Sequence, residues 1–235
     1  MEREYEGFSH AVRRVMNAAQ RGALQGIHGP VSRLISVRDD AAVAVEIALG
    51  AAMQNIVTDD EETARRAIGL LKSRDAGRAT FLPLTAIRGG RLSERGLENQ
   101  PGFIGILSDI VVYEERYRAI FQSLLGRTVL VETIDDAIAV ARTYAHRFRI
   151  VTLDGQVVNA GGSMTGGSLN RSAGILSRAN ELAKLSEQLP GMEEKLANEQ
   201  AAYEEASRET SALTYQMELA ESELRTAQSL SLIHI

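Results

Sequence analysis

GGSMTGGS, at residues 161–168, is the segment that is most informative about the organisation of this chain. It follows an apolar, strand-like run at 148–153 and precedes a long heptad-patterned segment. Four glycines in seven residues leave a backbone almost without Cβ atoms, so another group can approach the main chain closely or φ can turn positive. Two uses are common for such a backbone. Its amides can cradle a phosphate, or a second polypeptide can pack against it.

The phosphate interpretation requires the P-loop pattern GxxxxGK[ST]. Gly161 and Gly166 have its spacing, but Gly167 stands where the lysine belongs, and Ser168 follows. Without that ammonium group nothing reaches the β- and γ-phosphates of a nucleotide. The segment therefore favours a surface for backbone packing, with a nucleotide-binding module as the alternative.

The composition indicates a soluble protein with much helix-on-helix packing, because aromatic residues make up only 5% of it and tryptophan is absent. No cysteine is present, which excludes disulfide and thiolate chemistry and agrees with a cytoplasmic location. No apolar run has the length of a membrane span, and the N-terminus does not resemble a signal peptide. A net charge of −5 argues against a uniformly basic nucleic-acid binder.

The first 25 residues predict an N-terminal coiled-coil arm. Apolar residues recur there at alternating steps of three and four, and Gly22 and Gly26 end the pattern. The residues of this seam are Tyr5, Phe8, Val12, Val15 and Ala19.

An internal repeat begins at Gly26. Residues 26–32 align with residues 102–108 at one constant offset, which also carries Leu49-Gly50 onto Leu125-Gly126. Each copy then predicts a strand, a helix that begins with a capping pattern, and a second strand parallel to the first. The capping patterns are Thr58 with Glu61 in the first copy and Thr133 with Asp136 in the second. Residues 26–170 are thus expected to form two related α/β subdomains, at about 26–100 and 101–170, with residues 85–100 bridging them.

Residues 171–228 predict a C-terminal coiled-coil arm, because their apolar residues keep the three-four rhythm over many heptads. Pro190-Gly191 predicts a kink or break in it. Residues 229–235 abandon the heptad and resemble translated vector sequence, so they are expected to be a non-native tail of a truncated piece. A globular insert reverses the chain, so the two arms can pair only with each other, antiparallel. The expected fold is α+β.

A series of ordered motifs now becomes recognisable. It consists of GIHGPVS at 26–32, LG and NIV within 49–57, TFLPL at 80–84, LLGRT at 124–128 and GGSMTGGS at 161–168. Together with the arms, this series resembles the hinge of bacterial structural maintenance of chromosomes (SMC) proteins, of the condensin type. The resemblance covers residues 1–228.

The resemblance implies a rod with an ATPase head, an antiparallel coiled coil and a hinge that dimerises to close one end of a DNA-embracing ring. It implies a homodimer contact at Gly161, Gly162, Ser163, Gly166 and Gly167. ATP, Mg²⁺ and contacts with other condensin subunits would belong to the head, which this chain lacks, so no cofactor and no enzymatic activity are expected here. The implied setting is chromosome condensation and segregation at the nucleoid.

The distribution of charge suggests DNA contact independently of the family. Residues 7–38 and 155–180 contain no acid and carry +5 and +2, so the remainder of the chain carries −12. Antiparallel arms would bring both stretches together where the arms join the globular domain. There they would form a basic surface, here called the basic collar, that could bind the phosphate backbone of DNA. The alternative is that these arginines form an ordinary solvated helix face. The proposed DNA-binding residues are Arg13, Arg14, Arg21, Arg171 and Arg178.

Other chemistry is not indicated by the sequence. The histidines, His10, His28, His146 and His234, have no metal-ligand spacing. The acids at 59–62 are expected to cap a helix rather than to catalyse hydrolysis. Ser163, Thr165 and Ser168 have no evident base, so a serine or threonine nucleophile is not expected. A coiled-coil adaptor without a DNA role is a further alternative.

Overall fold

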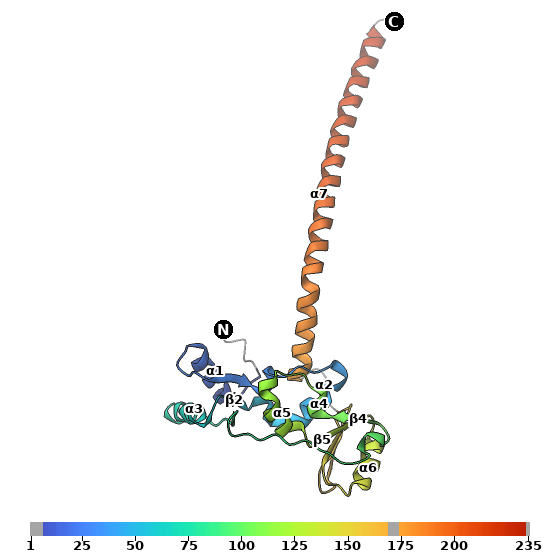
Figure 1. The fold of residues 1–235 in the computed structure, drawn as a ribbon. Helices are drawn as coiled ribbons and strands as arrows, with labels where there is room; N and C mark the ends of the chain where they lie inside the picture. Colours follow the sequence, from blue (N-terminus) through green and yellow to red (C-terminus); the bar gives the residue numbers. More distant parts are fainter. Residues whose placement is uncertain (1–6, 169–173, 234–235) are drawn as a thin grey trace. The chain divides into compact units, whose positions relative to one another are not determined.

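The computed structural model describes residues 7–168 and 174–233, and Figure 1 shows the chain. It divides into two compact units, residues 1–180 and residues 181–235. The first unit holds all the strands of the described residues, and the second consists of most of one long helix. Among the described residues, no helix is long and apolar enough to cross a membrane.

The first sheet has three strands in the order β1 (Ile27–Pro30), β2 (Ile56–Thr58) and β3 (Phe81–Pro83). Strand β1 is antiparallel to β2, and β2 is parallel to β3. Helix α3 (Glu61–Ser73) connects the parallel pair. The parallel strand–helix–strand unit predicted for this copy of the repeat is confirmed.

The second sheet repeats the same arrangement and then extends it. Its first three strands are β4 (Phe103–Ile106), β5 (Thr128–Val131) and β6 (Arg149–Thr152), paired antiparallel and then parallel. Both copies even share a register shift, between Ile27 and Gly29 and between Phe103 and Gly105. Two short antiparallel strands then continue the second sheet: β7 (Val157–Val158) and β8 (Met164–Thr165).

The two halves meet at equivalent positions of the repeat. Ser36 and Val112 exchange two backbone N–H···O bonds of 2.8 Å each, forming an isolated antiparallel bridge. Helices α2 (Asp39–Leu49) and α5 (Arg118–Leu125) come from different halves, and their buried residues belong to one shared hydrophobic core. The repeat therefore forms a single packed unit.

A half-buried arginine stabilises this contact. Arg149 on β6 reaches the end of α2, where its guanidinium donates to the carbonyls of Ala48 (2.7 Å) and Ile47 (3.2 Å). A cation at a helix C-terminus satisfies carbonyls that have no partner within the helix and complements the helix dipole. Burial lowers the pKa of Arg149, although it remains charged at neutral pH.

The caps of the two crossover helices differ. Thr133 begins α6 (Ile134–Thr143) with a capping box in which Asp136 is the reciprocal acid, as the sequence predicted. In α3 the cap is Asp60, which accepts the Thr63 N–H at 2.8 Å, and not Thr58, which is buried in β2. The prediction that Thr58 caps α3 is wrong, because the strand continues one residue further than expected.

The N-terminal seam packs differently from its prediction. Helix α1 (His10–Gln20) buries Val12 and Val15, and they lie in one cluster with Ala67 and Leu71 of α3. The apolar residues predicted to form the seam of a coiled-coil arm thus pack inside the globular unit, where α1 covers the first sheet and α3. Tyr5 lies outside the described residues.

The remaining short helices complete the first unit. They are η2 (Val31–Arg33), η3 (Gly50–Gln54), η4 (Leu97–Asn99), α4 (Leu107–Ile110) and η5 (Glu115–Tyr117). The predicted bridge at 85–100 is anchored by Leu92 and Leu97, both 3% exposed in the core of the second half.

Helix α7 (Ile175–Ile233) passes through Pro190 without a break. Of the kink or break predicted at Pro190-Gly191, the break does not occur, because a proline costs a helix about 3 kcal/mol, a penalty that long helix-forming flanks can offset. The kink stays a prediction. Its heptad residues are open to solvent in this single chain; Leu185 is 55% exposed and Tyr203 is 75% exposed. An apolar seam of this length is typical of a coiled-coil strand without its partner. The helix continues through residues 229–233 of the expected non-native tail.

Candidate functional site

The glycine-rich segment forms the outer edge of the second sheet. Strand β8 pairs with β7 through Val158↔Met164 and Val157↔Thr165, and no further strand of the described residues lies beyond it. Residues 163–168 are all exposed, and the Met164 side chain is 53% exposed. An exposed edge with unpaired backbone groups is a template for another strand.

The direction of the free backbone groups follows from one hydrogen bond. The Asn159 N–H donates to the Ser163 carbonyl at 2.8 Å, so that carbonyl points toward β7. The next N–H, that of Met164, belongs to the same planar peptide and therefore points away from β7. Because strand residues alternate in direction, the Met164 carbonyl also faces outward.

Gly161, Gly162 and Gly167 all have positive φ, of +86°, +96° and +141°, so each requires glycine for its backbone conformation. A Cβ atom on Gly161 or Gly167 would meet no atom of the described residues within 4 Å. A Cβ atom on Gly166 would collide with the side-chain amide of Gln156. The segment is thus open on the side of Gly161 and Gly167.

Three of the four glycine amides are already committed to acceptors within the chain. The N–H of Gly161 donates to the His146 carbonyl at 2.9 Å, and that of Gly162 to the Asn159 carbonyl at 3.0 Å. The Gly167 N–H donates to the side-chain oxygen of Gln156 at 2.9 Å. Amides that hold their own chain in this way cannot cradle a phosphate, so the geometry speaks against the nucleotide-binding alternative at this segment.

Gln156 is a contributor that the sequence did not single out. Its side chain accepts from the Gly167 N–H and donates to the Gly167 carbonyl at 3.2 Å, which holds the end of β8 to the sheet. A glutamine between Gly155 and Val157 gives no distinctive signal in a sequence. His146 lies beneath Gly162, and its Nδ1 is buried without a hydrogen-bond partner in the described residues.

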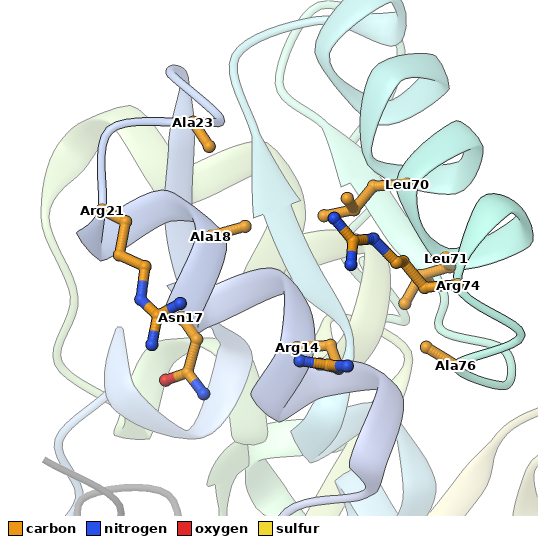
Figure 2. A pocket seen from close by; sticks show the side chains of 9 residues that line it. All are labelled: Arg14, Asn17, Ala18, Arg21, Ala23, Leu70, Leu71, Arg74 and Ala76. Atoms are coloured by element: carbon orange, nitrogen blue, oxygen red, sulfur yellow. The ribbon is translucent and has the colours of Figure 1, made fainter.

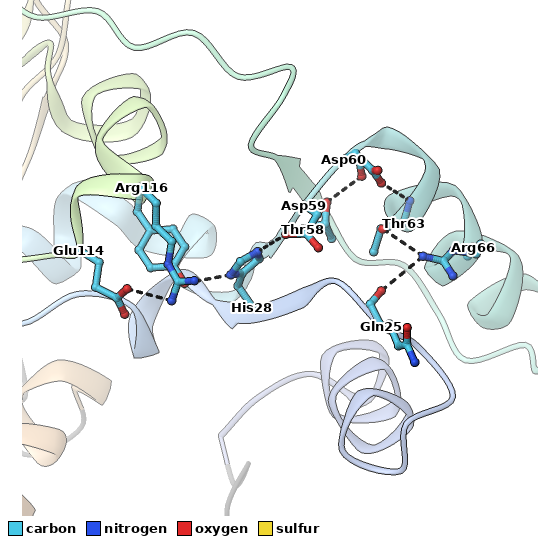
Figure 3. A network of polar contacts seen from close by, with 10 residues as sticks. Gln25, His28, Thr58, Asp59, Asp60, Thr63, Arg66, Glu114 and Arg116 are labelled. Atoms are coloured by element: carbon cyan, nitrogen blue, oxygen red, sulfur yellow. Dashed lines mark hydrogen bonds and ion pairs between the residues drawn. The ribbon is translucent and has the colours of Figure 1, made fainter.

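A polar network connects the two halves beside β1 (Figure 3). His28 contacts Asp59 Oδ1 through Nε2 (2.7 Å) and Tyr117 Oη through Nδ1 (3.0 Å). Tyr117 is 2% exposed, and burial raises the pKa of its hydroxyl. The guanidinium of Arg116 lies 4.8 Å from the centre of the Tyr117 ring and pairs with Glu114 at 2.8 Å.

This network is structural. His28 is held by one carboxylate and one phenol, and no group of three or more possible metal ligands occurs among the described residues. Asp60, which the sequence placed among the helix-capping acids, does cap α3, and the hydrogen bond from the Thr63 N–H lowers its pKa. A carboxylate cap of this kind stabilises a helix start and does not require a catalytic role.

The predicted basic residues fall into separate groups. Arg13 and Arg14 lie on α1 and Arg21 is its C-cap, and all three are exposed. Arg178 lies in the first turn of α7 and is exposed, and Arg171 lies outside the described residues. The structure therefore describes the α1 part of the expected collar and leaves its meeting with Arg171 untested.

Arg74 is a basic residue that the sequence analysis missed. It ends α3 and, with Arg14 and Arg21, lines a cavity between α1 and α3 (Figure 2). Arg74 does not lie in a stretch without acid, because Asp75 follows it directly. Only the packing of α1 on α3 brings these arginines together.

Comparison with known proteins assigns the family. The model of the flexible hinge domain of SMC proteins matches residues 24–141. The chromosome partition protein Smc of Bacillus subtilis is 44% identical over 201 residues, which span 84% of this chain and 17% of that protein. The chain therefore corresponds to about a sixth of the length of this relative.

Two solved structures have the same fold. One is an asymmetric dimer of the Geobacillus stearothermophilus SMC hinge domain, with 45% identity, a TM-score of 0.76, and coverage of 84% of this chain and 80% of that one. The other is the Pyrococcus furiosus Smc hinge domain with an extended coiled coil, with 26% identity, a TM-score of 0.57, and coverage of 96% and 77%. The chain belongs to the SMC family and contains its hinge domain with coiled-coil sequence attached.

Proposed function

We propose that this chain is the hinge dimerisation module of a chromosome partition protein, and that a second copy binds along the edge of β8. The observation that carries the proposal is the outward-facing N–H and carbonyl of Met164, at an exposed strand flanked by glycines on both sides. Main-chain hydrogen bonds to an added strand supply affinity, and the absence of side chains permits close approach. The related Geobacillus hinge domain forms a dimer.

The complementary edge is β3. In the repeat, β3 occupies the position of β6, and the outer side of β6 is covered by β7. The N–H of Ile56 donates to Thr80 and that of Leu84 to Thr58, so residues 80 and 84 face β2 and Phe81 faces outward. If β8 of each copy lies on β3 of the other, two equivalent contacts form and the dimer closes with twofold symmetry.

The test is Met164→Pro. A proline at this position removes the N–H that faces the free edge and leaves the bonds to β7 intact, a placement that edge strands tolerate. The matched control is Met164→Thr, which keeps the N–H and suits a strand. Sedimentation analysis should find the parent chain and Met164→Thr dimeric and Met164→Pro monomeric. A folded Met164→Pro chain that is as dimeric as the parent overturns the proposal.

The pairing of edges can be tested by cross-linking, because the chain contains no cysteine. A short bis-maleimide should join Met164→Cys to Thr80→Cys when the two single variants are mixed, because the two sites then lie across the contact. Met164→Cys alone should remain uncross-linked. Efficient cross-linking of Met164→Cys to itself would instead place β8 on β8 and contradict the role of β3.

DNA contact by α1 is a second candidate function. Arg13, Arg14 and Arg21 lie in a stretch without acid, and none of their side chains makes an ion pair within the described residues. Unpaired exposed guanidinium groups suit sequence-independent contact with phosphates. Arg171 and Arg178 would add to this surface. Charge reversal of Arg13 and Arg14 should weaken binding to duplex DNA and flatten its dependence on salt, measured by gel shift at several salt concentrations; unchanged binding would refute it.

In the longer protein, the exposed heptad seam of α7 would pair antiparallel with the segment that enters the hinge. The dimeric hinge would then close one end of a ring around DNA at the nucleoid. ATP and Mg²⁺ would be bound by a distant head, as would other condensin-type subunits. The work of this chain is then mechanical, without enzymatic activity of its own.

A further inference from the structure

A cavity of about 200 Å³ opens between α1 and α3 in the first half of the hinge (Figure 2). It lies on a different element from β8 and is not used by the proposed dimer contact. Its lining comes from the second half of α1, the turn after it and the end of α3. The lining residues are Arg14, Asn17, Ala18, Arg21, Ala23, Leu70, Leu71, Arg74 and Ala76.

The charge of the cavity is positive and unbalanced. Arg14, Arg21 and Arg74 are all exposed, and the structure gives none of them an ion pair or a side-chain hydrogen bond within the described residues. Within the part of the chain that the structure describes, no acid lines the cavity. A guanidinium group remains charged at any physiological pH and presents a planar set of donors that matches phosphate. Figure 2 shows Arg14 on α1, Arg21 at the end of α1 and Arg74 at the end of α3.

The interior of the cavity is apolar and small. Leu71 (4% exposed) and Ala76 (2% exposed) are buried, and Leu70 and Ala18 are half-buried. A cavity of about 150 Å³ lined by apolar side chains accepts benzene. The volume here suits one ring or two fused rings and lies below the range of about 300–1,000 Å³ for larger ligands. Asn17 is the one uncharged polar side chain in the lining, so discrimination between different rings is weak.

We infer that this cavity binds a small organic phosphate such as a nucleoside monophosphate. The aromatic ring of the ligand enters the apolar interior, and its phosphate group binds to the arginines. Guanidinium groups also stack on aromatic rings, so Arg14 or Arg74 can cover the ring after it enters. Such a nucleotide has two sources. It is either free in solution or the unpaired terminal nucleotide of a DNA strand.

The test is calorimetry of the full chain with deoxyadenosine monophosphate, deoxyadenosine and inorganic phosphate as probes. The nucleotide should bind more tightly than either of its parts, because only it uses both the apolar interior and the arginines. Ala18→Leu fills the cavity without a change of charge, and Arg74→Ser removes one guanidinium. Arg74→Ser should weaken nucleotide binding at least about tenfold, the usual loss for a charged hydrogen-bonding partner. Ala18→Leu should weaken it at least as much, because the larger side chain occupies the space of the ring. Lys72→Ser is the matched control: it removes one exposed positive charge from α3 outside the lining, and it should bind like the parent.

The source is distinguished with two DNA hairpins, one blunt and one with a single unpaired 5′-phosphorylated nucleotide. If the terminal nucleotide is the ligand, the overhang should tighten binding to the parent chain and have no effect with Ala18→Leu. If the ligand is free nucleotide, the two hairpins should bind equally well. In both cases Ala18→Leu should leave binding of blunt duplex unchanged, so failure of this proposal is distinguishable from failure of the proposed DNA contact. Absence of nucleotide binding to the parent, or binding that Ala18→Leu leaves intact, overturns the inference.

Discussion

The two sheets of the hinge begin alike and end differently. Strands β1–β3 and β4–β6 share their pairing, their crossover helix and their bulge, but only the second sheet continues into β7 and β8. The first sheet ends on β3, whose Pro83 is a residue that strands accept at an edge. The extended edge of the second sheet, β8, and the short edge of the first sheet, β3, are suited to pair with each other between two copies of the chain. The difference between the two sheets, more than the repeat itself, is what the proposed dimer contact uses.

The largest effect is expected from the core that the two halves share. Phe121 on α5 is fully buried, and its counterpart in the first half, Val45, is buried in the same cluster. Phe121→Ala should lower the free energy of unfolding by about 3–5 kcal/mol through lost burial and the cavity that remains. Urea denaturation should show a single transition for the first unit, with its midpoint at a lower urea concentration than in the parent chain. Two transitions, of which only one moves, would show that the halves fold independently.

A smaller effect is expected at the start of the crossover helices, where the repeats differ in chemistry. Thr133→Ala removes the side chain that accepts the Asp136 N–H and should cost about 1 kcal/mol. Thr133→Ser keeps a hydroxyl that accepts this N–H and donates to the Asp136 carboxylate, so it should be close to neutral. Thermal unfolding of the two variants measures the difference. If Thr133→Ser is as destabilised as Thr133→Ala, the hydroxyl does not cap α6.

The smallest effect concerns pH. Hydrogen bonds from the Thr63 backbone lower the pKa of Asp60 in the first half, and the Thr152 hydroxyl lowers that of Asp154 in the second. A carboxyl group with a depressed pKa in the folded state contributes stability above its unfolded value, near 3.8, and loses it as pH falls through the folded value. Unfolding free energy should therefore decline below about pH 4. Asp154→Asn should reduce that slope, and a slope unchanged in this variant would contradict the assignment.

Much of this organisation could be predicted from the sequence. The repeat was visible because Gly26 and Gly102 occupy matching turns; a Cβ on either would approach a side chain of the crossover helix. The strands β2 and β5 were visible as apolar runs. The packing of α1 on the globular unit could not be predicted, because a helix that packs on a globular domain and a helix in a coiled coil have the same apolar spacing.

The site was only partly predictable. The glycines indicated a backbone surface, but β7 and β8 are two residues each, too short to show strand alternation. Gln156 and Arg74 gained their roles through contacts between segments distant in sequence. The sequence left both a kink and a break open at Pro190, because a local rule for proline competes with the helix-forming residues on both sides of it, and α7 continues through this position.

The most direct test is hydrogen exchange at the Met164 amide as a function of protein concentration. In one chain this N–H faces the free edge of β8, whereas in the proposed dimer it donates to a strand of the second copy. Its exchange should be fast in dilute solution and become strongly protected as dimers form, while the Thr165 amide, which faces β7, changes little. A Met164 amide that still exchanges rapidly when the protein is dimeric would contradict the account.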